Sequence, residues 1–111
     1  MSRADDFGHF QELVFLAVLR LGSKAYGAAV RREIAERTQR DVDASAVFTT
    51  LDRLEAKGYL SSVVRDGVNI NANKPGPNPR RYFTVEAKGV KAFNKNRAET
   101  ACMMEGLRSL I

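Results

Sequence analysis

Cysteine, histidine and tryptophan are scarce in this chain of 111 residues, and their scarcity excludes several classes of protein. Cys102 is the only cysteine, His9 is the only histidine, and tryptophan is absent. An intramolecular disulfide and a zinc site of four Cys/His ligands are therefore excluded. The sequence also offers no Ser-His-Asp set and no glycine-rich phosphate loop that opens a helix. We expect no metal, no cofactor and no enzymatic activity.

Long hydrophobic runs are also missing. The longest run covers residues 13–19, only seven residues, whereas a transmembrane helix needs roughly 20. No small-residue cleavage site follows this run, so no secretory signal is recognisable. These absences predict a cytoplasmic protein without a membrane segment. The length allows one domain with a single core.

Positive charge is present in excess. Eighteen Lys and Arg residues stand against thirteen Asp and Glu, so the formal net charge is +5 in an otherwise ordinary globular composition. The excess lies in residues 58–95, which carry seven positive and two negative side chains. Such a segment favours a polyanionic partner such as nucleic acid, although a solvated basic surface has the same composition.

Apolar periodicity and cap residues predict a mostly helical α+β fold. Gly22 and Gly58 end helical patterns, and Asp43 precedes one as an N-cap. Residues 66–79 hold all three prolines together with several Gly and Asn, which predicts a long hairpin loop. The predicted elements are helices over 9–21, 26–38 and 44–57, strands over 59–65 and 81–85, and a last helix over 86–111.

This order of elements is the plan of a winged helix-turn-helix protein, in which the third helix enters the major groove of DNA and the hairpin touches the flanking backbone. We predict a winged helix-turn-helix DNA-binding domain over residues 1–85. Residues 86–111 are predicted to form a long C-terminal dimerisation helix that packs with it in a single domain. Four apolar residues of the third helix are expected to face the core: Val47, Phe48, Leu51 and Leu54.

The other face of the third helix is short, polar and partly cationic. Small polar side chains let a helix approach base edges, and one or two cations reach guanine or phosphates. We predict eight DNA contacts, from the second helix, the third helix, the loop and the second strand: Tyr26, Ser45, Thr49, Thr50, Arg53, Lys74, Arg80 and Arg81. Tyr26 has a second interpretation as a packing aromatic, Arg53 as an ion-pair partner, and Lys74 as a solvated loop residue. Because side chains alternate along a strand, only one of Arg80 and Arg81 is expected to face the nucleic acid.

Four segments of the chain resemble the PadR-like family of winged-helix transcriptional regulators. They are residues 13–19, 25–27, 46–60 and 80–89, and the third segment followed by Arg-Arg-Tyr-Phe is specific as a set. The family usually has Tyr at the position of Phe48 and a proline near Ala87, and this chain has neither. The resemblance implies a homodimeric repressor of the short form, with a single C-terminal helix after the wing.

The last predicted helix has more apolar residues than a three-helix core and a hairpin can cover, which predicts an interface between two copies of the chain. The predicted interface residues are Phe10, Phe93, Ala101, Met104, Leu107 and Ile111. The phenylalanines and methionines pack the core or, as the resemblance implies, line a cavity for a small aromatic or hydrophobic effector. Cys102 is a small core or interface hydrophobe or a thiol sensor.

Together these observations predict a sequence-specific DNA-binding transcriptional regulator. In the favoured form it is a dimeric repressor that binds double-stranded DNA and is released by a small-molecule effector. The alternative is a winged-helix protein-interaction module, or an antirepressor, without specific DNA binding. The salt dependence of binding distinguishes the DNA-binding regulator from the protein-interaction module, because affinity that depends on contacts to several phosphates falls steeply as the salt concentration rises.

Overall fold

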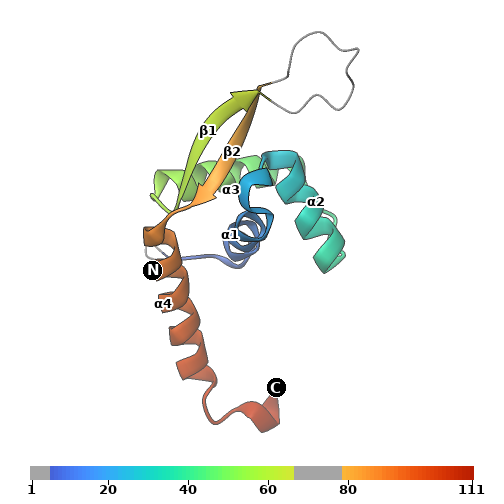
Figure 1. Cartoon of the computed structure of the whole chain (residues 1–111). Helices are drawn as coiled ribbons and strands as arrows, with labels where there is room; N and C mark the ends of the chain where they lie inside the picture. The colour runs from blue at the N-terminus through green and yellow to red at the C-terminus, as the bar shows by residue number, and fades with distance from the viewer. Residues whose placement is uncertain (1–5, 67–78) are drawn as a thin grey trace.

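A computed structural model describes residues 6–66 and 79–111, and its elements follow the predicted order (Figure 1). The first part holds the helices α1 (His9–Leu21), α2 (Gly27–Thr38) and α3 (Ala44–Ala56), with the 3-10 turn η1 (Gly22–Lys24) after α1. The second part holds the strands β1 (Leu60–Asp66) and β2 (Pro79–Val85), the helix α4 (Ala87–Met104) and the 3-10 turn η2 (Arg108–Leu110). The predicted fold class, a winged helix with a C-terminal helix, is confirmed.

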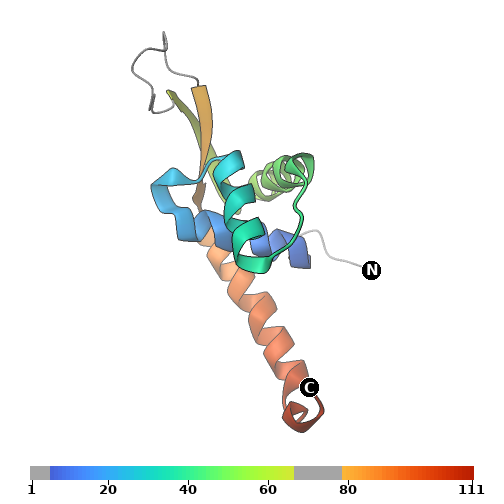
Figure 2. The same ribbon diagram turned by 90° about the vertical axis from the view of Figure 1, so that its right-hand side faces the viewer.

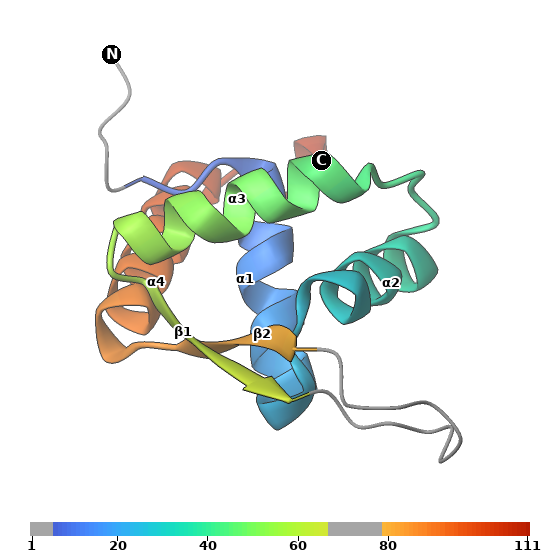
Figure 3. The same ribbon diagram turned by 90° about the horizontal axis from the view of Figure 1, so that it is seen from above.

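Helix α1 supplies the centre of the core. Val14, Phe15, Ala17 and Val18 are buried on it, and α2, α3 and the hairpin are arranged around it (Figure 3). Gly22 ends α1 with a positive φ of 57°, a conformation that glycine adopts without the steric cost of a side chain. The chain can therefore turn sharply toward α2.

Charged side chains hold α2 against its neighbours. Arg31 Nε donates to the carbonyl oxygen of Val42 at 2.6 Å, in the segment that leads into α3. Glu33 accepts a hydrogen bond from Arg37 on its own helix and lies 3.3 Å from Arg20 Nε on α1. The hydrogen bond from Arg37 lowers the pKa of Glu33, so this carboxylate stays ionised at neutral pH.

The hairpin is antiparallel and is attached to the start of α2. Leu60 pairs with Val85 at its base, and Arg65 pairs with Arg80 near its outer end. The backbone of Tyr26 forms an isolated bridge to Tyr82, just before α2 begins. A single β-bridge therefore joins the wing to the segment that leads into α2.

The first two turns of α4 pack on the core through an aromatic cluster. Phe93 stacks on Phe15 with ring centroids 5.5 Å apart, and it meets Phe7 edge to face at 5.6 Å. Gly89 is buried, and a Cβ at this position would come within 2.6 Å of the carbonyl oxygen of Tyr59. The helix can lie this close only because position 89 has no side chain. The C-terminal part of α4 extends away from the helical body and from the hairpin (Figure 2).

The predicted extent of the last helix is wrong at its C-terminal end. The apolar spacing predicts a helix through residue 111, but α4 ends at Met104 and is followed by a turn and η2. Gly106 has a φ of 84°, which lies outside the range of a right-handed helix. The apolar residues after Met104 therefore lie on a turn rather than along one face of a continuous helix.

Candidate nucleic-acid interface

Helix α3 presents a short polar surface to solvent. Asp43 caps its first turn by accepting from the backbone N–H of Ser45 at 3.2 Å, and the Ser45 hydroxyl donates to the other carboxylate oxygen of Asp43 at 3.0 Å. Ser45, Thr49 and Arg53 are exposed, as predicted. In the part of the chain that the structure describes, the guanidinium of Arg53 has no carboxylate partner. It is therefore available to an external group.

Two predictions for α3 are wrong. Thr50 was predicted to contact DNA, but its side chain is only 8% exposed. It lies with Val47, Leu51 and Leu54 on the buried stripe of the helix, whose positions are spaced i, i+3, i+4 and i+7. Phe48 was predicted to face the core, but it is 51% exposed, because it lies about 100° around the helix from Val47. Thr50 is a core residue, and Phe48 belongs to the exposed surface.

The ring of Phe48 lies across the start of α2. A Cβ at Gly27 would come within 2.1 Å of Cε1 of this ring, so the ring occupies the space that a side chain at position 27 would fill. Beside the ring, a cavity of about 320 Å³ separates α2 from β2, and Tyr26, Ala28 and Arg80 contribute to its lining. An apolar ring is therefore part of the surface that α3, α2 and the wing present together.

Arg81 faces α3 and pairs with its acidic side chains. Its Nη1 donates to Asp52 Oδ1 at 2.7 Å, its Nη2 pairs with Glu55, and its Nε donates to Ser62 Oγ at 3.0 Å. The hydrogen bond to Asp52, followed by that to Glu55, raises the pKa of Arg81. The single positive charge of the guanidinium offsets part of the negative charge that Asp52 and Glu55 place on this surface. The structure thus assigns Arg81 to the junction between β2 and α3.

Arg80 lies on the opposite face of the hairpin, as the alternation of side chains predicts. Its guanidinium carbon lies 4.2 Å from the ring centroid of Tyr26, and that of Arg65 lies 4.1 Å from the ring centroid of Tyr82. The two rings meet edge to face with centroids 5.7 Å apart. Like charges opposite each other on a hairpin repel, and here each cation is stabilised by an aromatic face. We call these four residues the Arg–Tyr cluster.

Sequence reasoning counted Arg65 within the basic segment but did not select it as a site residue. The signal was present in the alternation of the strands: Arg65 pairs directly with Arg80, so their side chains share one face. Phe48 was missed as a surface residue for a different reason, since its apolar character outweighed its position on the helix. Lys74 lies outside the described residues.

The predicted interface residues fall into two groups. Phe10 and Phe93 pack within the chain: Phe10 is partly buried against the core with Arg40 over its ring at 5.5 Å, and Phe93 belongs to the aromatic cluster. The others are exposed in the single chain: Ala101, Met104, Leu107 and Ile111. Cys102, beside them, is exposed as well.

Other kinds of site find little support in residues 6–66 and 79–111. No group of three or more His, Cys, Asp or Glu side chains there is arranged to hold a metal ion. None of the helices in those ranges combines the length and apolar character that crossing a membrane requires. The polar surface of α3, with the wing beside it, is the feature that matches a binding site for nucleic acid.

A recognition helix with a β-hairpin wing beside it is characteristic of the winged-helix class of DNA-binding proteins. Within this class, the model of the transcriptional regulator PadR-like family matches residues 15–95. The chain therefore belongs to the PadR-like family of transcriptional regulators. The resemblance seen in the sequence is confirmed.

Solved structures of similar fold agree with this assignment. A PadR family transcriptional regulator from Eggerthella lenta DSM 2243 is 24% identical with a TM-score of 0.64, over 91% of this chain and 84% of that chain. A transcriptional regulator from Clostridium thermocellum is 16% identical with a TM-score of 0.66, over 91% of each chain. The complex structure of hsRosR-S4 is 20% identical with a TM-score of 0.62, over 93% of this chain and 78% of that chain. No curated protein matches in sequence.

Proposed function

We propose that this chain is a homodimeric repressor that binds a two-fold related DNA site through α3 and the wing. Its family consists of DNA-binding transcriptional regulators. The observation that carries the proposal is the exposed polar surface of α3, with Thr49 and Arg53 free of carboxylate partners among the described residues. In such a dimer the two α3 helices enter successive major grooves about 34 Å apart. Bound at a promoter, the dimer represses by occlusion.

Each residue of α3 has a distinct part in this proposal. Arg53 has no carboxylate partner among the described residues, and its guanidinium suits the O6 and N7 acceptors of guanine or a phosphate. The Ser45 hydroxyl already donates to Asp43, so toward DNA it acts as an acceptor. Thr49 lies between them on the exposed surface and offers both a hydroxyl and a methyl group. Arg81 contributes indirectly, because its positive charge offsets part of the negative charge of Asp52 and Glu55.

The wing contributes contacts to the backbone of DNA. Arg65 and Arg80 lie on one face of the hairpin, each on an aromatic ring that orients its guanidinium. Tyr26 precedes α2, where the free N–H groups of a helix N-terminus favour a phosphate. These contacts carry no sequence information and set the register of α3 in the groove. Lys74 remains a predicted contact from the loop.

Dimerisation is proposed from the apolar surface at the C-terminal end. Five large apolar side chains there are exposed, by 41–78%: Met103, Met104, Leu107, Leu110 and Ile111. Several large apolar side chains exposed near one another in the sequence are typical of a protein interface. In the proposed mechanism a small aromatic or hydrophobic effector binds between the protomers and changes the separation of the two α3 helices. The dimer then no longer matches both half-sites, and the DNA is released.

The DNA-binding proposal is tested by titrating the protein with fluorescent duplexes from its own upstream region and with a random duplex of equal length. If about six phosphates are contacted, affinity falls roughly 10³-fold between 50 and 200 mM salt. Arg53→Ala is expected to weaken the specific duplex by about 10-fold or more and the random duplex less. The matched variant Arg65→Ala/Arg80→Ala is expected to weaken both duplexes equally. Binding to a partner protein that persists at high salt, with no DNA preference, would replace the proposal by the protein-interaction module.

The dimer proposal has its own test. Met104→Glu/Leu107→Glu places two charges on the exposed apolar surface and is expected to give monomers in light scattering coupled to size-exclusion chromatography. Arg32→Glu, at an exposed position on α2, serves as a control for added negative charge. A dimer that survives the double substitution would locate the interface elsewhere on the chain.

A further inference from the structure

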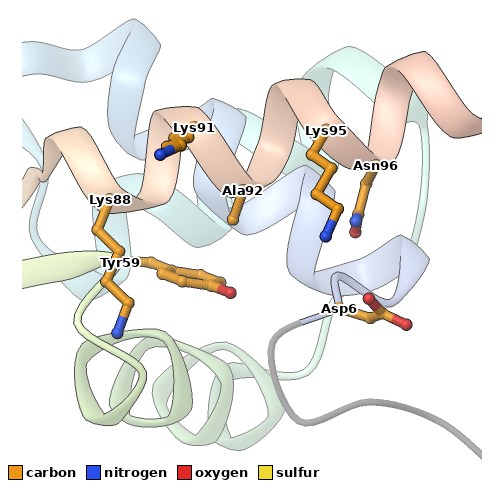
Figure 4. A pocket seen from close by; sticks show the side chains of 7 residues that line it. All are labelled: Asp6, Tyr59, Lys88, Lys91, Ala92, Lys95 and Asn96. Carbon is orange, nitrogen blue, oxygen red and sulfur yellow. The ribbon is translucent and has the colours of Figure 1, made fainter.

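A second basic site lies on α4, where three lysines surround one cavity. Lys88, Lys91 and Lys95 follow one another at helical spacing and line a pocket of about 230 Å³ together with Tyr59 and Asn96. In Figure 4 the side chains of Lys88 and Lys95 extend on either side of the Tyr59 ring. We call this cavity the lysine pocket; Asp6 and Ala92 complete its lining.

The three lysines are not paired with a carboxylate in the part of the chain that the structure describes. Within residues 6–66 and 79–111, none of them forms an ion pair or a hydrogen bond. The neighbouring Lys57 is different, because its Nζ donates to the backbone oxygen of Asp6 and to Gln11 Oε1. The carboxylate of Asp6 is the single acidic group in the lining of the pocket. Several like charges around one cavity raise one another's energy, and a bound anion would remove that cost.

Asn96 adds a neutral donor to the lysine pocket. Its Oδ1 accepts from the backbone N–H of Phe7 at 2.7 Å, which fixes the orientation of the amide. The amide nitrogen keeps two N–H donors, and in the described part of the chain no acceptor is bonded to them. The three ammonium groups and the oriented amide give the pocket more donors than the one carboxylate of Asp6 can accept from, and this excess matches the oxygens of a phosphate or carboxylate.

The lysine pocket is separate from the candidate nucleic-acid interface. It lies where the start of α4 meets the turn between α3 and β1, whereas α4 continues away from the hairpin (Figures 1 and 2). The Arg–Tyr cluster lies on the hairpin and at the start of α2. The basic segment seen in the sequence thus divides into residues of the wing and residues of α4. The proposed DNA contacts involve the wing residues only.

We propose that the lysine pocket binds a small multivalent anion that carries phosphate or carboxylate groups. The volume, about 230 Å³, is close to that of seven or eight waters in the liquid and below the usual range of drug-sized sites. A compact anion fits this space. The bound anion would bridge α4 and the turn that holds Tyr59.

The test uses the full chain without DNA, so that its outcome does not depend on the repressor proposal. Inorganic pyrophosphate and citrate are titrated separately by calorimetry and by following backbone amide resonances, with sodium chloride keeping the ionic strength constant. Saturable binding is expected, with the largest shifts at Gly58, Tyr59 and Gly89. Lys91→Gln/Lys95→Gln is expected to weaken binding by about tenfold, which corresponds to two exposed charge contacts. Lys24→Gln/Arg32→Gln removes two exposed cations elsewhere and is expected to leave binding unchanged.

Either anion alone would support the proposal and would identify phosphate or carboxylate as the preferred group. The proposal is overturned if neither anion saturates at millimolar concentration, or if both double variants lose binding equally. Shifts centred on Arg65 and Arg80 would also overturn it, since they would place the anion on the wing.

Discussion

Replacing Arg81 by methionine decides whether this residue joins the wing to α3 or contacts DNA directly. Its guanidinium pairs with Asp52 and Glu55 and donates to Ser62 Oγ. Methionine keeps most of the apolar stem and removes the charge. The structure predicts two effects: the domain becomes less stable, and the carboxylates of Asp52 and Glu55 lose their cationic partner beside the proposed DNA-binding surface.

The size of the stability loss follows from the exposure of the three groups. The side chain of Arg81 is 43% exposed, that of Asp52 is 61% exposed and that of Glu55 is 30% exposed. Contacts of this kind contribute about 0.5–1 kcal/mol each, well below the value of a buried pair. We expect Arg81→Met to lower the free energy of unfolding by about 1–2 kcal/mol, or the melting temperature by about 5–10 °C.

The assay is a mutant cycle read by thermal unfolding and by DNA titration. Asp52→Asn/Glu55→Gln is combined with Arg81→Met, and the triple variant is expected to regain most of the stability and DNA affinity that Arg81→Met loses. Arg53→Met is the control, because Arg53 has no carboxylate partner in the described ranges and its loss leaves the melting temperature unchanged.

A direct DNA contact would give a different pattern. Arg81→Met would then lower the slope of log affinity against log salt by about 1, and the triple variant would bind as weakly as Arg81→Met. That result would refute the assignment of Arg81 to the junction between β2 and α3.

Gly89→Ala is expected to cost about 1–3 kcal/mol in chemical denaturation, because its Cβ would lie 2.6 Å from the carbonyl oxygen of Tyr59. Asn94→Ala, at an exposed position within the same helix, is the control, and equal losses would contradict the close approach of α4. The pKa of Glu33 is lowered in the folded protein, so its ion pairs stabilise the fold at pH values above the pKa of an unfolded glutamate, about 4.3. This contribution to stability is lost as the pH falls through the lower pKa of the folded state. Melting temperatures of Glu33→Gln and the parent protein should therefore differ at neutral pH and converge in acid, and a constant difference would exclude this origin. The exposed thiol of Cys102 is expected to react more slowly with a disulfide reagent as protein concentration rises and the proposed dimer forms; a rate independent of concentration would place Cys102 outside the interface.

Local patterns were sufficient to predict the order of the elements, although not the C-terminal end of α4. Asp43 and Gly58 mark the two ends of α3, and both do so through short-range hydrogen bonds or a positive φ that depend on the residue itself. The order of three helices and a hairpin then indicated a winged helix. The same reasoning failed for Thr50 and Phe48, because it placed apolar residues in the core and polar residues on the surface. Which side of α3 is buried depends instead on the elements that pack against it. Gly27 leaves open the space that Phe48 occupies.

The sequence by itself determined the helices, the hairpin, the excess of positive charge and the family, since each depends on residue type and on spacing along the chain. The tertiary structure alone decided which cations remain available. Arg81 meets Asp52 and Glu55 across 29 and 26 residues, Arg65 and Arg80 lie on the aromatic rings of the Arg–Tyr cluster, and the lysines of α4 surround a separate pocket. The physical reason is that an ion pair depends on the distance in space between two charges, and periodicity along the chain specifies only the face of the element on which each charge lies.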